Sequence, residues 1–305
     1  MHLLGPTLVA DWKALGAEFS RPDAAYASAD ALLASAAGSV SDLTGAWLVP
    51  MAHLYGNEEF RLGLGLSEEE EERRAHAENL HVAREAARRP GTTGALVSVD
   101  PLRPWALREL ERMRHEPGVI GAKVHLACAG FDFTDPEHLT RLERVVAWVE
   151  QADQVLLLHL DPQRRGTETD DVRRLLERVL GPHRDATVVI AHLGGSGGFG
   201  PWTQAVLATL TTWLDDEAAG GHPRPGVLVD LSAVPMIRES EGVPPTSEEE
   251  LAALAPALRR LGLERVLFGS DFPVFDPREH ARFLRERSGL GEAELAPILA
   301  RRLRP

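Results

Sequence analysis

Two short apolar runs decide the fold: VLLLH at 155–159 and TVVIAH at 187–192, each of which ends on a histidine. His159 and His192 are 33 residues apart, about the length of one strand–helix unit. An amphipathic stretch near 170–180 lies between the two runs. The pattern therefore predicts a strand, a helix and a second, parallel strand, with a histidine at the carboxyl end of each strand.

The same alternation of short apolar runs and longer amphipathic segments extends in both directions along the chain. Further strands are predicted at 45–51, 94–99, 119–125, 227–231 and 265–271, with a stub at His2–Leu4 as the eighth, first in order. Helices are predicted near 68–89, 105–115, 136–152, 170–180, 201–217 and 248–261, with a closing helix or pair of helices at 277–302. This order predicts an α/β fold, a (β/α)8 TIM barrel, as a single domain over residues 1–305.

Composition narrows the class of protein. The chain has 305 residues, of which 44% are hydrophobic and 26% charged, as in an ordinary globular enzyme. The net charge of −13 argues against a nucleic-acid partner, which would need a basic face. No run approaches the ~20 apolar residues of a membrane span. The single cysteine, Cys128, excludes an internal disulfide, and with no secretory signal visible we expect a cytoplasmic protein. The sequence leaves a homo-oligomer open.

Three metal-competent residues occupy the same place in their segments. His159, His192 and Asp271 are each the last residue of an apolar run. In a parallel barrel the carboxyl ends of the strands form the catalytic face. Imidazole and carboxylate groups are the usual ligands of a catalytic divalent metal. We therefore expect the three side chains to gather around a metal at that face.

A buried lysine is the second unusual feature. Only Lys13 and Lys123 are lysines among 33 basic residues, so a lysine inside an apolar strand calls for a chemical reason. Either it forms an ion pair with a buried carboxylate, or it carries CO2 as a carbamate that bridges two metals. His125 lies two residues further and so points to the same side; we expect it to contact the substrate. Arg164, after the run at 155–159, is expected to bind a substrate carboxylate or, with Arg165, to be a solvated charge.

Five motifs together resemble a known family. They are HLLG at 2–5, GAKVHL at 121–126, LLLHLD at 156–161, VIAHLGG at 189–195 and LFGSDFPV at 267–274, and they occur in the family's order. The chain resembles the amidohydrolase superfamily, in particular its amidohydrolase-related (amidohydrolase 2) branch of metal-dependent TIM-barrel hydrolases.

The resemblance implies a set of metal ligands. It assigns His2, His159 and Asp271 to the ion, which is zinc or, as an alternative, manganese. It implies that His192 acts on the substrate or water in members with one metal and binds the second metal in members with two. In those two-metal members Lys123 would be the carbamate bridge.

The chain departs from the family pattern at its first strand. The family has a histidine two positions before the one that matches His2, and the sequence as printed begins at Met1. The first ligand of the pair is therefore missing from it, and the first strand is expected to be short.

These residues predict a hydrolase of a small-molecule ester, amide or lactone. The metal would lower the pKa of bound water from 15.7 towards ~7, Asp271 would take and return its proton, and His192 would polarise the scissile carbonyl. A metal-dependent decarboxylase, which other members of the branch exemplify, is the alternative. A non-catalytic barrel is a third interpretation.

The glycine-rich loop at 194–200 matches two other motifs. Residues 194–198 fit G-x-S-x-G, with Ser196 as nucleophile and Asp271 and His280 following in serine-hydrolase order. Against this, Ser196 lies four residues past the strand end. Residues 195–200 fit the G-x-G-x-x-G of a dinucleotide fold, but they follow the sixth strand instead of the first. A flexible loop beside an active site explains the glycines as well.

Overall fold

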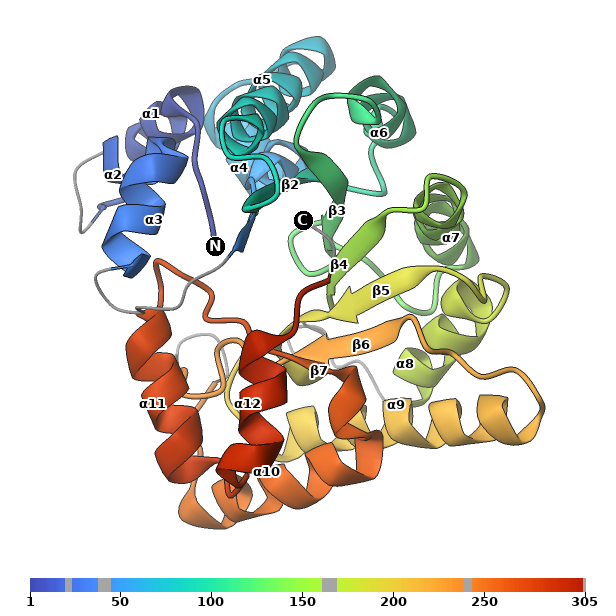
Figure 1. Ribbon diagram of the computed structural model, residues 1–305. Helices are drawn as coiled ribbons and strands as arrows, with labels where there is room; N and C mark the ends of the chain where they lie inside the picture. The colour runs from blue at the N-terminus through green and yellow to red at the C-terminus, as the bar shows by residue number, and fades with distance from the viewer. Residues whose placement is uncertain (20–23, 38–44, 161–168, 238–242, 304–305) are drawn as a thin grey trace. The chain divides into compact units, whose positions relative to one another are not determined.

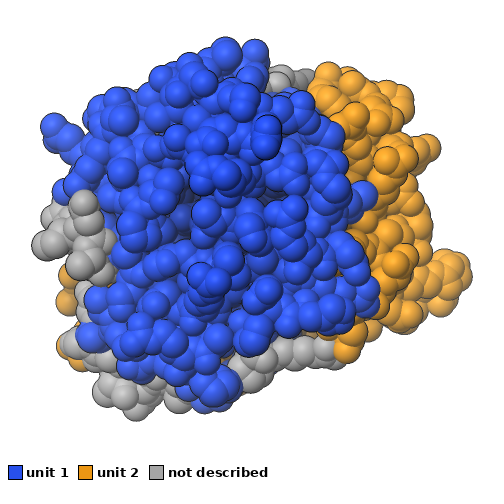
Figure 2. All heavy atoms as spheres, turned by 90° about the horizontal axis from the view of Figure 1, so that it is seen from above, with its two compact units in different colours: residues 1–131, 302–305 blue, residues 132–301 orange. Residues whose placement is uncertain are grey.

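The structure, a computed structural model, describes residues 1–19, 24–37, 45–160, 169–237 and 243–303 (Figure 1). The chain divides into two compact units (Figure 2). The N-terminal unit comprises residues 1–131 with 302–305, and the C-terminal unit comprises residues 132–301. The single domain expected over residues 1–305 stays a prediction.

The N-terminal unit contains three parallel strands in sequence order. They are β1 (Ala46–Leu48), β2 (Thr93–Val99) and β3 (Val119–His125). Every residue of β2 is buried, as in a strand of a parallel sheet that is covered on both faces. The expected first strand at His2–Leu4 is reduced to one parallel bridge between His2 and Val49.

Helices surround these strands. They are α1 (Pro6–Ala14), α2 (Ala24–Ala27), α3 (Ala29–Ala37), the 3-10 turn η1 (Ala52–Gly56), α4 (Glu58–Gly63), α5 (Glu68–Ala87) and α6 (Ala106–Met113). Helix α5 begins as predicted, because the Ser67 hydroxyl accepts a hydrogen bond from the Glu70 N–H at 3.2 Å. The carboxylate of Glu70 accepts hydrogen bonds from Arg73 and Arg74.

The C-terminal unit contains four parallel strands, again in sequence order (Figure 1). They are β4 (Val155–His159), β5 (Thr187–Ile190), β6 (Val227–Asp230) and β7 (Val266–Leu267). Three of them are shorter than predicted. The strand expected at 227–231 ends at Asp230. The strand expected at 187–192 ends at Ile190, and the one expected at 265–271 ends at Leu267.

The helices of this unit lie where the amphipathic segments predict them. They are α7 (Pro136–Gln151), α8 (Thr169–Leu175) continuing into the π-helical turn η3 (Leu176–Leu180), η4 (Ala191–Gly194), α9 (Pro201–Ala219), α10 (Glu248–Leu261), η6 (Leu263–Arg265), α11 (Pro277–Arg287) and α12 (Glu292–Ala300). The closing segment is a pair of helices, one of the two forms expected.

Within the ranges that the structure describes, none of the helices combines the length and the apolar character that a bilayer span requires.

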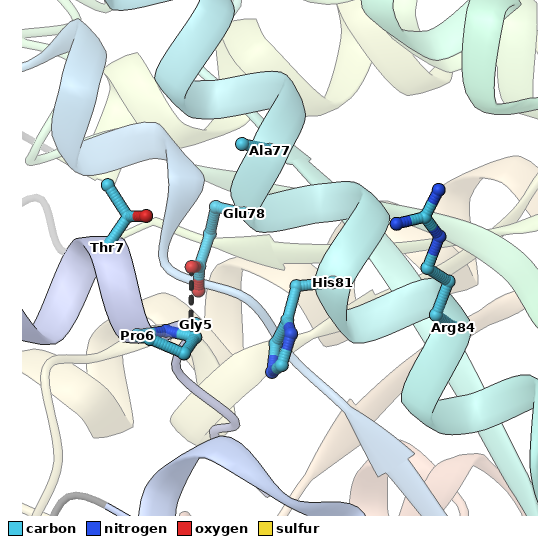
Figure 3. Close-up of a pocket in the computed structure, with 7 residues that line it drawn as sticks. All are labelled: Gly5, Pro6, Thr7, Ala77, Glu78, His81 and Arg84. Carbon is cyan, nitrogen blue, oxygen red and sulfur yellow. Dashed lines mark hydrogen bonds between the residues drawn. The ribbon is translucent and has the colours of Figure 1, made fainter.

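A buried carboxylate joins α1 to α5 in the N-terminal unit (Figure 3). Glu78 is 3% exposed, and its Oε2 accepts a hydrogen bond from the backbone N–H of Gly5 at 2.8 Å. Gly5 precedes α1 and has no side chain with which to cap it, so Glu78 caps this helix from α5. A Cβ at position 5 would lie 2.5 Å from Oε2. The contact therefore requires glycine.

The same contact borders a small pocket. Its volume is about 250 Å³, and it is lined by Gly5, Pro6, Thr7, Ala77, Glu78, His81 and Arg84 (Figure 3). Burial raises the pKa of Glu78 to about 8, against the lowering effect of the Gly5 N–H. Near neutral pH the folded chain therefore keeps a proton on this carboxyl that the unfolded chain gives up.

We predict that Glu78 makes stability fall as pH rises. Because the folded pKa of Glu78 lies above the unfolded value of 4.5, its contribution is complete below pH 4.5 and is lost between there and about 8. The loss is at most roughly 5 kcal/mol, at 1.36 kcal/mol per pKa unit. Denaturant unfolding of the wild type and Glu78→Gln between pH 5 and 9 measures it. Glu78→Gln should flatten the slope, and Glu69→Gln, an exposed change on the same helix, should not. Parallel slopes for wild type and Glu78→Gln would contradict the assignment.

Candidate active site

Two of the predicted site residues meet in the C-terminal unit. His159 is the last residue of β4, and His192 lies two residues beyond the end of β5 in η4. Their rings pack edge to face with centroids 4.6 Å apart. The register argument from the sequence therefore brings these two imidazoles together.

Asp230 and Ser232 hold His192 in place, the first through its backbone N–H and the second through its ring. The backbone N–H of His192 donates to Asp230 Oδ1 at 3.0 Å, and the N–H of Ser232 donates to the same oxygen at 2.9 Å. The Ser232 hydroxyl also donates to Asp230 and lies 2.8 Å from His192 Nδ1. Because that hydroxyl proton is directed to Asp230, the oxygen accepts from Nδ1–H. The lone pair of the neutral imidazole is then on Nε2, where a metal or a proton can bind.

The backbone is strained at two predicted residues. His192 has φ 53° and ψ 38°, its neighbour Leu193 has φ 55°, and Asp271 has φ 57°. This left-handed region costs a non-glycine residue on the order of 1 kcal/mol and is over-represented at functional sites. The left-handed conformation of His192 and Leu193 is also the reason why β5 ends earlier than predicted, since a left-handed residue cannot continue a strand.

Asp271 lies in a turn four residues after the end of β7 and is half-buried. Its charge acts on His280, as does that of Asp230, and both raise the pKa of His280. Burial has the larger, opposite effect and lowers that pKa to about 4, so His280 is neutral near pH 7. A common ion shared by Asp271, His159 and His192 stays a prediction.

The other expected residues lie in the N-terminal unit. Lys123 is buried at 3% exposure within β3. Burial lowers the pKa of His53 well below its usual range, and the charges of Lys123 and His2 lower it further. His125, the last residue of β3, stacks its ring on His53 with centroids 5.2 Å apart. The roles predicted for His2 and Lys123 as ligands and for His125 as a substrate contact are not tested by these contacts. Arg164 and Arg165 lie outside the described residues.

Sequence reasoning missed three residues that hold these side chains. Asp230 ends β6, but the apolar run predicted as this strand, 227–231, extends one residue further and so hid the end-of-strand signal. Ser232 follows it by two positions. His53 lies in η1, beyond the end of β1, where no strand pattern points to it.

The serine-hydrolase arrangement is wrong. His280 Nε2 lies 2.9 Å from the carbonyl oxygen of Leu231. His280 Nδ1 is buried and has no hydrogen-bond partner among the residues that the structure describes. Neither nitrogen therefore bonds to Ser196, so His280 does not act as its base.

The dinucleotide motif is not supported either. In a phosphate-binding loop the backbone N–H groups stay available for the ligand. Here the N–H of Gly198 donates to the carbonyl of Ala233 at 2.9 Å, and that of Phe199 donates to the Thr246 hydroxyl at 3.0 Å. A Cβ at Gly197 would lie 2.8 Å from a methionine sulfur. Packing explains the glycines of this loop.

The donor set fits a divalent ion. The adjoining imidazoles of His159 and His192 can supply nitrogen ligands. Ser232, which is hydrogen-bonded to Asp230, occupies Nδ1 of His192 and leaves the lone pair on Nε2 for the ion. Such outer hydrogen bonds fix the tautomer and orientation of metal-binding histidines.

Comparison with known proteins identifies a family. The family model described as Amidohydrolase (Amidohydro_2) matches residues 63–301. No curated protein matches the chain at the threshold used.

Several solved structures are similar to the chain. A 5-carboxyvanillate decarboxylase from Sphingomonas paucimobilis has a TM-score of 0.61 and 17% identity, over 93% of this chain and 84% of that one. A dihydroxybenzoic acid decarboxylase from Polaromonas sp. JS666, with bound manganese and 2-nitroresorcinol, has a TM-score of 0.61 and 16% identity, over 97% and 92%. The apo IDCase of Metarhizium anisopliae has a TM-score of 0.57 and 15% identity, over 97% and 84%. These matches confirm the predicted α/β fold of the TIM-barrel class.

We predict that Ser232→Ala destabilises the C-terminal unit. The substitution removes one donor to the buried carboxylate of Asp230 and the acceptor of His192 Nδ1, so we expect a loss of about 1–3 kcal/mol. Denaturant unfolding measures it, with Ser196→Ala on the glycine loop as the matched control, for which a smaller change is expected. Equal effects of the two substitutions would show that Ser232 does not hold His192.

Proposed function

Because the chain belongs to the amidohydrolase family, we propose that it is a metal-dependent enzyme that decarboxylates a small aromatic carboxylic acid. The support is the set of similar structures, which includes decarboxylases of 5-carboxyvanillate and 2,6-dihydroxybenzoate. The sequence alone favoured hydrolysis and kept decarboxylation as the alternative. The comparisons favour the alternative.

The proposed metal centre uses the residues that the motifs single out. His159, His192 and Asp271 would hold a divalent ion in the C-terminal unit. The roles that the family resemblance implies for His2 and Lys123 stay predictions. The structures with bound manganese support manganese over the zinc expected from sequence. A divalent ion supplies Lewis-acid polarisation of substrate oxygens.

Decarboxylation needs one proton at one carbon. The bond between the ring carbon and the carboxyl group breaks, CO2 leaves, and the electron pair stays on the ring carbon. That carbon then takes a proton, which we assign to the carboxyl group of Asp271. Water returns a proton to Asp271 for the next cycle. Ser232 would keep the Nε2 lone pair of His192 directed to the ion.

Hydrolysis of an ester, amide or lactone is the second candidate. The observation that favours it is the tautomer of His192, because an imidazole with its lone pair on Nε2 can also accept a proton from water. The two reactions differ in their products, so one assay separates them.

We predict release of CO2 from hydroxylated benzoates, lost on treatment with a chelator. Asp271→Asn should lower the rate by about 10²–10⁴-fold because the proton donor is removed. Ser196→Ala should leave the rate unchanged. The measurement is CO2 release and product formation with a panel that contains ortho-hydroxybenzoates, aryl esters, anilides and lactones.

The panel also decides between the alternatives. Turnover of esters or lactones without CO2 release would favour the hydrolase. Protein that binds metal but turns over nothing on the panel would favour the non-catalytic barrel. A rate that survives Asp271→Asn would refute the assigned proton donor.

A separate prediction concerns metal binding in the absence of substrate. Mn²⁺ should stabilise the wild type, by about 2.7 kcal/mol when its concentration is 100 times Kd, and His159→Asn should abolish the effect. His115→Asn, an exposed change on the N-terminal unit, is the control and should behave as wild type. Thermal unfolding with and without Mn²⁺ measures the shift. Equal stabilisation of all three proteins would place the ion elsewhere.

A further inference from the structure

We infer that His53, His125 and Cys128 form a second metal site, specific for zinc, inside the N-terminal unit. The ligand atoms that these three residues offer all lie within 4.8 Å of one another. None of the three is among the ligands that the family resemblance implies, and the inference does not depend on the proposed decarboxylase activity.

His53 carries the strongest evidence. The residue is 1% exposed. Its Nδ1 lies 2.7 Å from the Ser98 hydroxyl, which also accepts the backbone N–H of His53 at 3.2 Å. The other ring nitrogen, Nε2, is buried and makes no hydrogen bond within the described part of the chain. A buried polar atom without a partner is costly, and a metal ion at Nε2 would supply that partner.

Ser98 is itself held in place by a neighbouring helix. Its backbone N–H donates to Asn79 Oδ1 at 2.9 Å, and Asn79 Nδ2 donates to the Ser98 carbonyl at 3.1 Å and to Glu109 Oε1 at 3.0 Å. The hydroxyl that contacts His53 Nδ1 is therefore fixed by α5 and α6. Hydrogen bonds of this kind hold the imidazole of a metal-binding histidine in one orientation.

His125 and Cys128 come from one tight turn at the end of β3. The turn closes through the Ala129 N–H, which donates to the His125 carbonyl at 3.1 Å, and Asn57 Nδ2 donates to the Cys128 carbonyl at 2.9 Å. The Cys128 N–H lies 3.3 Å from His125 Nδ1, a long contact. The turn thus brings the thiol beside the imidazole that stacks on His53.

Two imidazoles and a thiolate are a zinc ligand set. In a tetrahedral site with Zn–N near 2.0–2.1 Å and Zn–S near 2.3 Å, ligand atoms are about 3.5 Å apart. The cluster therefore needs to contract by about 1 Å, which the turn that carries Cys128 can provide. Burial is the main cause that lowers the pKa of His53, followed by the charges of Lys123 and His2; the neutral imidazole that results is the form that binds metal.

The charge and the polarisability of the Cys128 thiolate determine which metal ion the site prefers. The thiolate of Cys128 brings one negative charge, which offsets part of the repulsion between a dication and Lys123. Thiolate favours zinc over manganese, which prefers oxygen ligands. With three protein ligands, the fourth position of a tetrahedral zinc ion is left for water or another small ligand.

The experiment uses Cys128 as its own reporter, because it is the one cysteine of the chain. Full-length protein is freed of metal with a chelator and titrated with Co²⁺ as a spectroscopic substitute for zinc. We expect a thiolate-to-cobalt charge-transfer band in the near ultraviolet that saturates at one ion per chain and is displaced by Zn²⁺. Zn²⁺ should also slow modification of the thiol by a cysteine reagent about tenfold or more, since a bound thiolate is a poor nucleophile.

Variants assign the ligands. Cys128→Ser should remove the charge-transfer band. His53→Asn and His125→Asn should each weaken the band and end the protection of the thiol by Zn²⁺. The control, His115→Asn, should change neither the band nor the protection. Circular dichroism checks that each variant is folded. If the buried substitution His53→Asn prevents folding, His125→Asn alone tests the histidine ligands. Absence of the band, or thiol protection that persists without both histidines, overturns the site. Mn²⁺ binding by wild type and His159→Asn reports on the other centre independently, so failure of one assignment leaves the other standing.

Discussion

The carboxylate of Asp230 connects the end of β6 to the turn that follows β5. One of its oxygens accepts two backbone N–H groups, from His192 and Ser232, together with the Ser232 hydroxyl. A buried carboxylate with three donors is well satisfied, and the N–H of His192 donates to it with the backbone turned away from the strand. The left-handed conformation of His192 is thus sustained by hydrogen bonds that an extended residue at this position would lose.

His53, in the N-terminal unit, is held in a similar way to His192. In both places a serine hydroxyl contacts Nδ1, and the serine is fixed in turn by a side chain from another element, Asp230 for Ser232 and Asn79 for Ser98. Each arrangement leaves Nε2 as the nitrogen available for chemistry. His280 differs, because its Nε2 contacts a backbone carbonyl and its ring is buried. Its low pKa therefore reflects a neutral histidine held inside the protein, a structural role.

The parts of the fold that follow a regular period could be predicted from the sequence. Strand β3 and helix α10 have the predicted bounds, because apolar runs and amphipathic periodicity reflect burial directly. Helices α1 to α4 were not predicted: α2 and α4 have four and six residues, and the alanine-rich α3 has little amphipathic pattern. The predicted ends of β5, β6 and β7 were wrong. At β5 the reason is the left-handed His192, which no periodicity records.

Part of the candidate site could also be predicted from the sequence. His159 and His192 were found because catalytic residues of parallel barrels follow the strand ends, and the end of a run is visible in sequence. Their supports were harder to find. Ser232 and Ser98 matter through one hydroxyl each, and serine is common enough that only the contact reveals its role. His53 needed the fold, because its partners His125 and Cys128 lie more than 70 residues away along the chain.

Ligand type would keep two metal centres chemically distinct. His159, His192 and Asp271 offer nitrogen and carboxylate oxygen, which suit manganese as well as zinc. The cluster of His53, His125 and Cys128 contains the chain's one thiol, and thiolate discriminates strongly against manganese. A manganese-rich supply would then load the first set and leave the second to zinc. This selectivity follows from where the chain places a single cysteine and needs no difference in the size of the two sites.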